Sequence, residues 1–91
     1  MTKIEQLQKF IELNKLEFTE GRRNSDLVVL CGYALYIDAT KEDAWDSIPE
    51  GIDGDYDELD TEFSRVFDYA DHNGYGKWWN IESNRKTYKL P

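Results

Sequence analysis

Apolar residues recur every three or four positions at the start of the chain, the spacing of one buried helix face. These positions are Ile4, Leu7, Phe10 and Ile11. Thr2 precedes the periodic run and is a residue type that caps helices well. The pattern predicts an N-terminal helix within residues 1–16, followed by a loop over residues 17–24, where glycine and small polar residues interrupt the periodicity.

The pattern over residues 25–38 fits two structures. A helix places on one face Leu27, Leu30, Cys31, Ala34 and Leu35. A strand is favoured instead by the β-branched pair Val28 and Val29, and Cys31-Gly32-Tyr33 can form a hairpin bend. We expect the helix because its periodicity is complete, but the sequence leaves the hairpin open.

The first residues of this expected helix can stabilise it, whereas Gly32 in its middle weakens it. Ser25 or Asn24 can cap it by accepting free backbone N–H groups, and Asp26 then lies near the positive end of the helix dipole. Gly32 costs the helix about 1 kcal/mol. The same glycine permits another element to approach closely.

Two further helices are predicted by caps and periodicity. Thr40 and Asp43 have the spacing of a capping box before a helix over residues 40–48, which Pro49 ends. The pattern over residues 56–72 is longer, and its inner face consists of Leu59, Phe63, Val66, Phe67 and Ala70.

Residues 73–91 form a basic, aromatic tail after Asn73-Gly74 stops the last helix. We expect this tail to be a short β-hairpin or an extended arm. The 91 residues contain no repeat or linker and suit one domain, residues 1–91. The predicted fold is mainly α, an orthogonal bundle of three to four helices with a short C-terminal β-hairpin or extended arm.

The net charge of −8 is unevenly distributed along the chain. Residues 1–24 hold five basic and four acidic side chains, residues 25–72 hold two and fourteen, and residues 73–91 hold four and one. This distribution indicates a two-faced molecule with different partners on its two sides. Alternatively, the acidic residues serve only to keep a small, aromatic-rich domain soluble.

Residues typical of catalytic or metal sites are scarce. The single cysteine excludes an internal disulfide framework and suits a cytoplasmic protein, and Cys31 has the neighbours of a core side chain. Asp53, Asp55 and Asp57 alternate as in a calcium loop, but Glu58 replaces the glycine that such a loop needs. We expect no enzyme, no metal site, no cofactor, and neither a signal peptide nor a membrane span.

Two clusters suit nucleic-acid binding. The tail combines rings that can stack on bases with cations for phosphates: Lys77, Trp78, Trp79, Arg85, Lys86, Tyr88 and Lys89. The second cluster is Arg22, Arg23 and Asn24 at a predicted helix start, where arginines oppose the dipole. Each has a structural alternative. One tryptophan can close the core while the other stays half exposed, and the arginines can pair with the acidic loop of the same chain.

The segment Gly21-Arg22-Arg23-Asn24-Ser25 and the helices after it resemble the small helical C-terminal domain of primases from phages, plasmids and other mobile elements. The resemblance covers residues 17–72, and it rests on Gly21, Arg22, Asn24 and the apolar face that follows. In those primases the domain follows a catalytic part and links priming to a helicase, to DNA or to another replication component. The resemblance therefore implies a stand-alone version that acts in trans with a primase, polymerase or helicase, with single-stranded DNA as a second partner.

The N-terminal helix or the acidic side is the expected docking surface for that protein partner, and the acidic side contains Asp53, Asp55, Asp57 and Glu58. The expected function is a non-catalytic accessory to DNA priming or replication in a mobile element or phage. The alternative is an acidic DNA mimic that inhibits a host DNA-binding or defence protein, based on eleven carboxylates between Asp38 and Glu62. A third possibility is a regulatory protein that binds only other proteins. The basic tail beside two tryptophans argues against a mimic.

Overall fold

The computed structural model describes residues 1–52 and 55–91, and these residues form helices without a strand. In chain order the elements are α1 (Lys3–Leu13), α2 (Arg23–Tyr36), α3 (Lys41–Ser47), α4 (Tyr56–His72), the 3-10 helix η1 (Tyr75–Asn80) and the single turn α5 (Glu82–Arg85).

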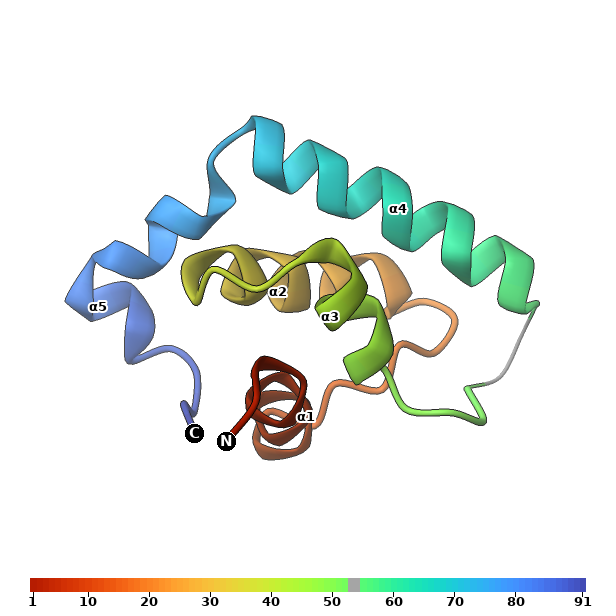
Figure 1. Ribbon diagram of the computed structural model, residues 1–91, viewed down its shortest axis with the longest axis horizontal. Coiled ribbons are helices and arrows are strands. Elements are labelled where there is room, and N and C mark those ends of the chain that lie inside the picture. The colour runs from red at the N-terminus through yellow and green to blue at the C-terminus, as the bar shows by residue number, and fades with distance from the viewer. Residues whose placement is uncertain (53–54) are drawn as a thin grey trace.

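Helix α2 lies at the centre of the fold. It packs against α1, α3, α4 and η1, and Figure 1 shows α1 nearly end-on while α2 and α4 run across the view. The mainly helical structure confirms that part of the predicted fold class, and each of the four predicted helices is present.

Side-chain caps explain where three of the helices begin. At α1 the Thr2 hydroxyl accepts the Glu5 N–H at 3.1 Å, and the Glu5 carboxylate accepts the Thr2 N–H at 3.0 Å. Thr40 and Asp43 form the corresponding capping box at α3. Asp55 caps α4 by accepting the Asp57 N–H at 2.8 Å. These local contacts confirm the predicted capping box at Thr40 and the predicted cap at Thr2.

Residues 25–36, for which the sequence fitted both a helix and a strand, are helical, so the hairpin at Cys31-Gly32-Tyr33 is excluded.

The predicted cap of this helix, Ser25 or Asn24, was wrong. Helix α2 begins at Arg23 after an N-cap residue, Arg22, whose side chain makes no capping bond. Asn24 and Ser25 lie inside the first turn, where Ser25 Oγ donates to the Arg22 carbonyl at 3.0 Å. The sequence contains several good capping residues in a row, and only the path of the preceding loop selects the first residue of the helix.

The predicted C-terminal β-hairpin is also wrong. Gly74, with φ +68°, ends α4 in the left-handed region, and the chain continues as η1 and α5. Backbone bonds close locally instead of across strands, as in Asn84 N–H to Ile81 O at 3.0 Å. An isolated two-stranded hairpin is marginal in water. The helical path allows Trp79 to enter the core, and this burial stabilises the segment more than the pairing of two isolated strands would.

Trp79 is 2% exposed and joins the C-terminal segment (residues 73–91) to the core. Its indole contacts five other rings, with centroid distances between 5.1 and 6.2 Å: Phe10, Tyr33, Tyr36, Trp78 and Tyr88. Burial of an aromatic ring of this size stabilises a fold by roughly 4–6 kcal/mol as an upper estimate. The segment is therefore part of the domain core.

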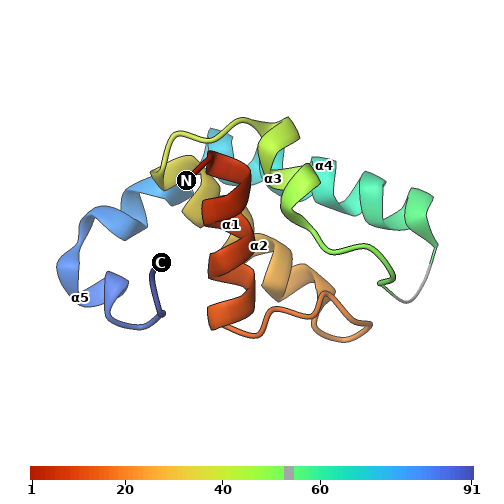
Figure 2. The same cartoon turned by 60° about the horizontal axis from the view of Figure 1, so that its bottom comes forward.

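A pair of hydrogen bonds holds the end of this segment against α1. The Asn14 side-chain amide donates to the Lys89 carbonyl and accepts the Lys89 N–H, both at 2.8 Å. The same amide donates to the Phe10 carbonyl at 2.9 Å, so its orientation is determined by α1. Figure 2 shows the C-terminal end of the chain beside α1.

Two glycines permit the close packing of η1 on α2. A Cβ atom at Gly76 would lie 3.0 Å from Leu35 Cβ and 3.2 Å from the backbone of Leu35 and Tyr36. A Cβ atom at Gly32 would lie 3.2 Å from Nε1 of Trp79, which is a side-chain atom. The predicted role of Gly32 in close approach is confirmed, and Gly76 has the same role from the opposite side.

We expect Gly76→Ala to lower the free energy of unfolding by about 1–3 kcal/mol, because the helix backbone it meets cannot yield. Gly32→Ala serves as the matched control. Its clash is with a side chain, and alanine gains about 1 kcal/mol of helix propensity, so its net effect should be smaller. Urea unfolding followed by circular dichroism measures both, and equal stabilities for the two variants would contradict the proposed packing.

Candidate functional site

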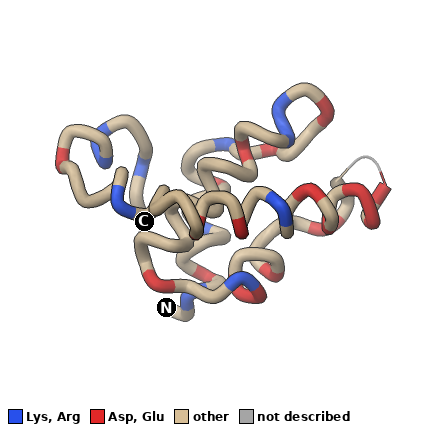
Figure 3. The backbone as a smooth tube through the Cα atoms, turned by 90° about the horizontal axis from the view of Figure 1, so that it is seen from above, with Lys and Arg blue, Asp and Glu red and all other residues tan. Residues whose placement is uncertain are grey.

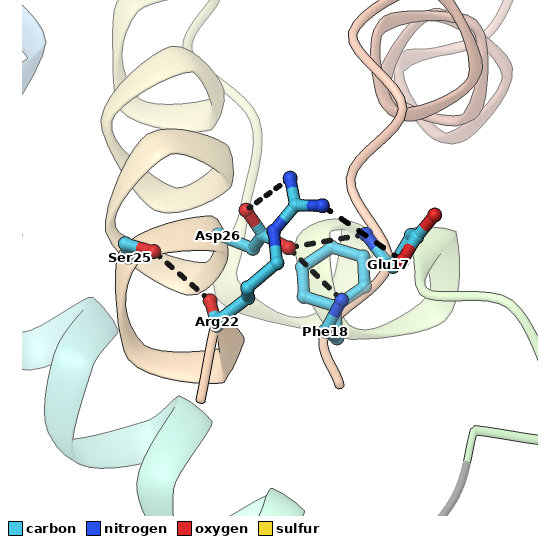
Figure 4. A network of polar contacts seen from close by, with 5 residues as sticks. All are labelled: Glu17, Phe18, Arg22, Ser25 and Asp26. Carbon is cyan, nitrogen blue, oxygen red and sulfur yellow. Dashed lines mark hydrogen bonds and ion pairs between the residues drawn. The ribbon is translucent and has the colours of Figure 1, made fainter. Parts of the chain in front are cut away.

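The loop before α2 and the first turn of α2 surround one buried carboxylate, that of Asp26 (Figure 4). Asp26 is 5% exposed, and its Oδ2 accepts the backbone N–H groups of Glu17 at 3.1 Å and Phe18 at 3.0 Å. Phe18 is fully buried with φ +57°, a conformation that costs a non-glycine residue about 1–2 kcal/mol. The two bonds to Asp26 hold the loop in this strained conformation.

Arg22 and Arg23 are connected to the same loop. The Arg22 guanidinium lies 3.9 Å from Asp26 Oδ1 and 3.8 Å from Glu17 Oε2, and Arg23 Nε donates to the Phe18 carbonyl at 3.3 Å. The arginines therefore do contact acceptors of their own chain. For Arg22 these are Glu17 and Asp26, before and inside α2. The Arg22 side chain remains 54% exposed, so the outer side of its guanidinium is accessible to a ligand. Asn24 is exposed on the first turn of α2.

At the other end of α2 the two adjacent tryptophans have different environments. Trp79 lies in the core, whereas Trp78 is 42% exposed and its ring lies 6.0 Å from that of Tyr88 in an edge-on arrangement. Between α2 and the C-terminal segment is an open slot of about 230 Å³, lined by Val28, Val29, Gly32, Tyr75, Trp78, Trp79 and Tyr88. Trp78 and Tyr88 are therefore candidate stacking residues that solvent can reach, and Trp79 supports them from the inside.

The predicted cations of the tail are distributed over several sides. Lys77 lines a different hollow together with Asp38 and Asp71. Arg85 Nη1 donates to the Trp79 carbonyl at 2.8 Å and thereby ties α5 to η1. Lys86 lies 3.8 Å from Glu82 in a highly exposed pair, which contributes little to stability. Lys86 and Lys89 are exposed, two residues before and one residue after Tyr88 of the slot.

The predicted acidic docking residues lie at the start of α4. Asp55 is its N-cap, Asp57 and Glu58 are exposed in its first turn, and Asp53 lies outside the described residues. Figure 3 shows acidic positions gathered at this end of α4, across the molecule from the C-terminal segment, where most charged positions are basic. The uneven charge along the sequence therefore becomes a separation in space.

The aliphatic wall of the slot was not identified from the sequence. Val28 and Val29, which favoured a strand in the sequence, lie on α2, and both are half buried. The sequence does place Val28 and Val29 on a second apolar face of this helix, opposite the face that contains Leu27 and Leu30. Periodicity shows that a face is apolar, but not what covers it.

Within residues 1–52 and 55–91, no three His, Cys, Asp or Glu side chains gather closely enough to hold a metal ion. The helices found in those residues include none that is long and apolar enough to cross a membrane.

Cys31 is fully buried on α2. Burial raises the pKa of its thiol from 9.0 to about 12, although the positive charge of Lys41 lowers it slightly. The neutral thiol is thus favoured in the folded state, in agreement with the predicted core role. Only the thiolate is an effective nucleophile.

We expect Cys31 to resist alkylation at pH 8 in the folded protein. The difference in pKa alone lowers the thiolate fraction about a thousandfold relative to an unfolded chain, and burial blocks the reagent as well. Mass spectrometry after iodoacetamide treatment, with and without urea, measures this directly because the chain has one cysteine. Comparable labelling under the two conditions would contradict the buried position.

Substitutions at Asp26 test the loop. Asp26→Ala should lower the free energy of unfolding by about 2 kcal/mol or more, because the Glu17 and Phe18 N–H groups lose their acceptor. Asp26→Asn should recover part of this loss, since an amide oxygen can accept both bonds. Arg22→Ala should cost less than about 1 kcal/mol because its ion pairs are long and exposed. Thermal or urea unfolding measures the loss of stability in each variant. A larger loss of stability in Arg22→Ala than in Asp26→Ala would contradict the expected order.

Comparisons of the chain with protein-family models, with curated proteins and with solved structures gave no match. The resemblance to primase C-terminal domains therefore remains a prediction from the residues of the sequence.

Proposed function

We propose that this chain is a non-catalytic accessory protein of DNA priming or replication in a mobile element or phage. In this proposal the C-terminal segment contacts single-stranded DNA, and the acidic start of α4 docks a primase, polymerase or helicase. The resemblance of residues 17–72 to primase C-terminal domains supplies the biological context of the proposal.

The observation that carries the DNA contact is the exposed Trp78 beside an apolar slot, in the C-terminal segment, where four basic side chains stand against one acidic side chain. Proteins bind single strands by stacking bases on aromatic rings while cations contact the phosphates. Lys86 and Lys89 precede and follow Tyr88 in the sequence, and both are exposed, so their ammonium groups are accessible to phosphates.

The overall charge of −8 limits the ways in which DNA can approach. Phosphates are repelled by the start of α4 and attracted by the C-terminal segment on the opposite side, where most charged positions are basic (Figure 3). This geometry favours a short contact with a flexible single strand over a long contact with a duplex. The acidic end then remains free for a protein partner with a basic surface.

One observation favours the alternative of a DNA mimic. Asp55, Asp57, Glu58 and Asp60 are all exposed at the start of α4, as a mimic of successive phosphates would require. A mimic would bind a host protein through this end and would not bind DNA. The two functions therefore make opposite predictions about DNA binding by the isolated chain.

We expect the protein to bind labelled single-stranded DNA more tightly than duplex, with affinity that falls as salt rises. For single strands the slope of log K against log salt is about 0.7 per phosphate contact. Lys86→Ala/Lys89→Ala should reduce the slope by about 1.4, and Trp78→Ala should weaken binding with little change in slope. Fluorescence anisotropy at several salt concentrations measures both quantities.

The control variants remove cations and an aromatic ring outside the C-terminal segment. Lys9→Ala/Arg65→Ala removes two exposed cations outside the C-terminal segment, and Tyr56→Ala removes an aromatic ring of similar exposure at the acidic end. Both controls should bind like the wild type. Absence of binding to either form of DNA would refute direct DNA contact and would favour the DNA mimic.

A further inference from the structure

The slot beside Trp78 has two chemically different walls. Val28, Val29 and Gly32 of α2 form an aliphatic wall, and the rings of Tyr75, Trp78, Trp79 and Tyr88 come from the C-terminal segment. Among the residues that the structure describes, none that lines the slot is charged. A planar apolar group can therefore enter without burying a charge of the protein, which would be costly.

The size of the slot limits its occupant. Its volume of about 230 Å³ is below the roughly 300–1,000 Å³ of sites for drug-sized ligands. A closed apolar cavity of about 150 Å³ is enough to hold benzene. One nucleobase is thus of suitable size, whereas a whole nucleotide cofactor or a helix is too large.

Charge complementarity distinguishes between possible occupants of that size. The C-terminal segment holds four basic side chains and only one acidic side chain, in a protein whose net charge is −8. An apolar side chain of a partner protein has no need of these cations. A base in a single strand carries a phosphate on either side, and Lys86 and Lys89 occupy positions on either side of Tyr88 in the sequence.

We propose that the slot holds one unstacked base of a single strand, against Val28 and Val29 and beside the rings of Trp78 and Tyr88. This inference rests on the proposed single-strand contact and adds the position at which one base is bound. The polar groups of the lining side chains are tyrosine hydroxyls and indole N–H groups, so the slot recognises an aromatic ring and discriminates weakly among bases.

The test combines a protein variant whose slot is filled by a larger side chain with an oligonucleotide that has no bases. Val28→Phe adds apolar bulk to the slot, and an oligonucleotide of abasic deoxyribose units keeps the phosphates but has no base to insert. On (dT)8 the variant should bind about 5- to 150-fold more weakly than the wild type, the range expected for loss of one stacked base. On the abasic strand of equal length the variant and the wild type should bind equally. The non-additivity of the two changes is the signature of a direct contact.

Two controls separate filling of the slot from damage to the fold. Leu13→Phe adds bulk at a half-buried position of α1 outside the slot and should bind (dT)8 like the wild type. Near-ultraviolet circular dichroism should show the same aromatic packing in Val28→Phe as in the wild type. The salt slope of Val28→Phe should also be unchanged, because phosphate contacts remain.

The outcomes distinguish the two proposals. No binding of (dT)8 by the wild type overturns both the single-strand contact and the base site. Binding of (dT)8 that Val28→Phe does not weaken keeps the single-strand contact and overturns the base site. The slot would then be assigned to an apolar side chain of a protein partner. A penalty of equal size on the (dT)8 and abasic strands also overturns the base site.

Discussion

The packing of Trp79 against α2 is the interaction on which the rest of the structure depends. It joins residues 73–91 to a core otherwise formed by α1, α2, α3 and α4. The indole can reach its position because Gly76 lets η1 approach the Leu35 backbone and Gly32 leaves room beside Nε1. A chain of 91 residues has little apolar surface to bury, so a ring of this size is a large share of its core. This need explains why the tail is helical and packed, and does not form a hairpin or a free arm.

The position of Trp79 also determines which surface remains available. Adjacent residues of a tight helix point in different directions, so a buried Trp79 places Trp78 at the surface. The bonds between Asn14 and Lys89 hold the segment that carries Tyr88 against α1, and together these constraints form the slot. The slot is thus a by-product of core packing, which explains its apolar lining. Lys86 and Lys89, which precede and follow Tyr88 in the sequence, belong to the same segment but do not line the slot.

Asp26 has a similar role at the other end of α2. Asp26 follows directly after the segment that suggests a primase domain, and its carboxylate accepts two backbone N–H bonds from the loop before α2. Arg22 and Arg23 contact this loop, so their placement at a helix start has a structural explanation. The exposed half of Arg22 leaves a DNA contact physically possible.

Local chemistry was sufficient to predict the four main helices, two of their caps and the core role of Cys31, because periodicity, capping boxes and apolar neighbours act within a few residues. The cap of α2, the course of the tail and the separate roles of Trp78 and Trp79 depended on contacts between residues far apart in the chain. The aromatic, basic composition of the tail was evident in the sequence. The sequence allowed one tryptophan to close the core while the other stays half exposed, but it did not show which of the two is buried or that the cations are scattered. Side chains with the same local pattern compete for a single core, and only the tertiary arrangement of α1, α2 and η1 decides which of them enters it.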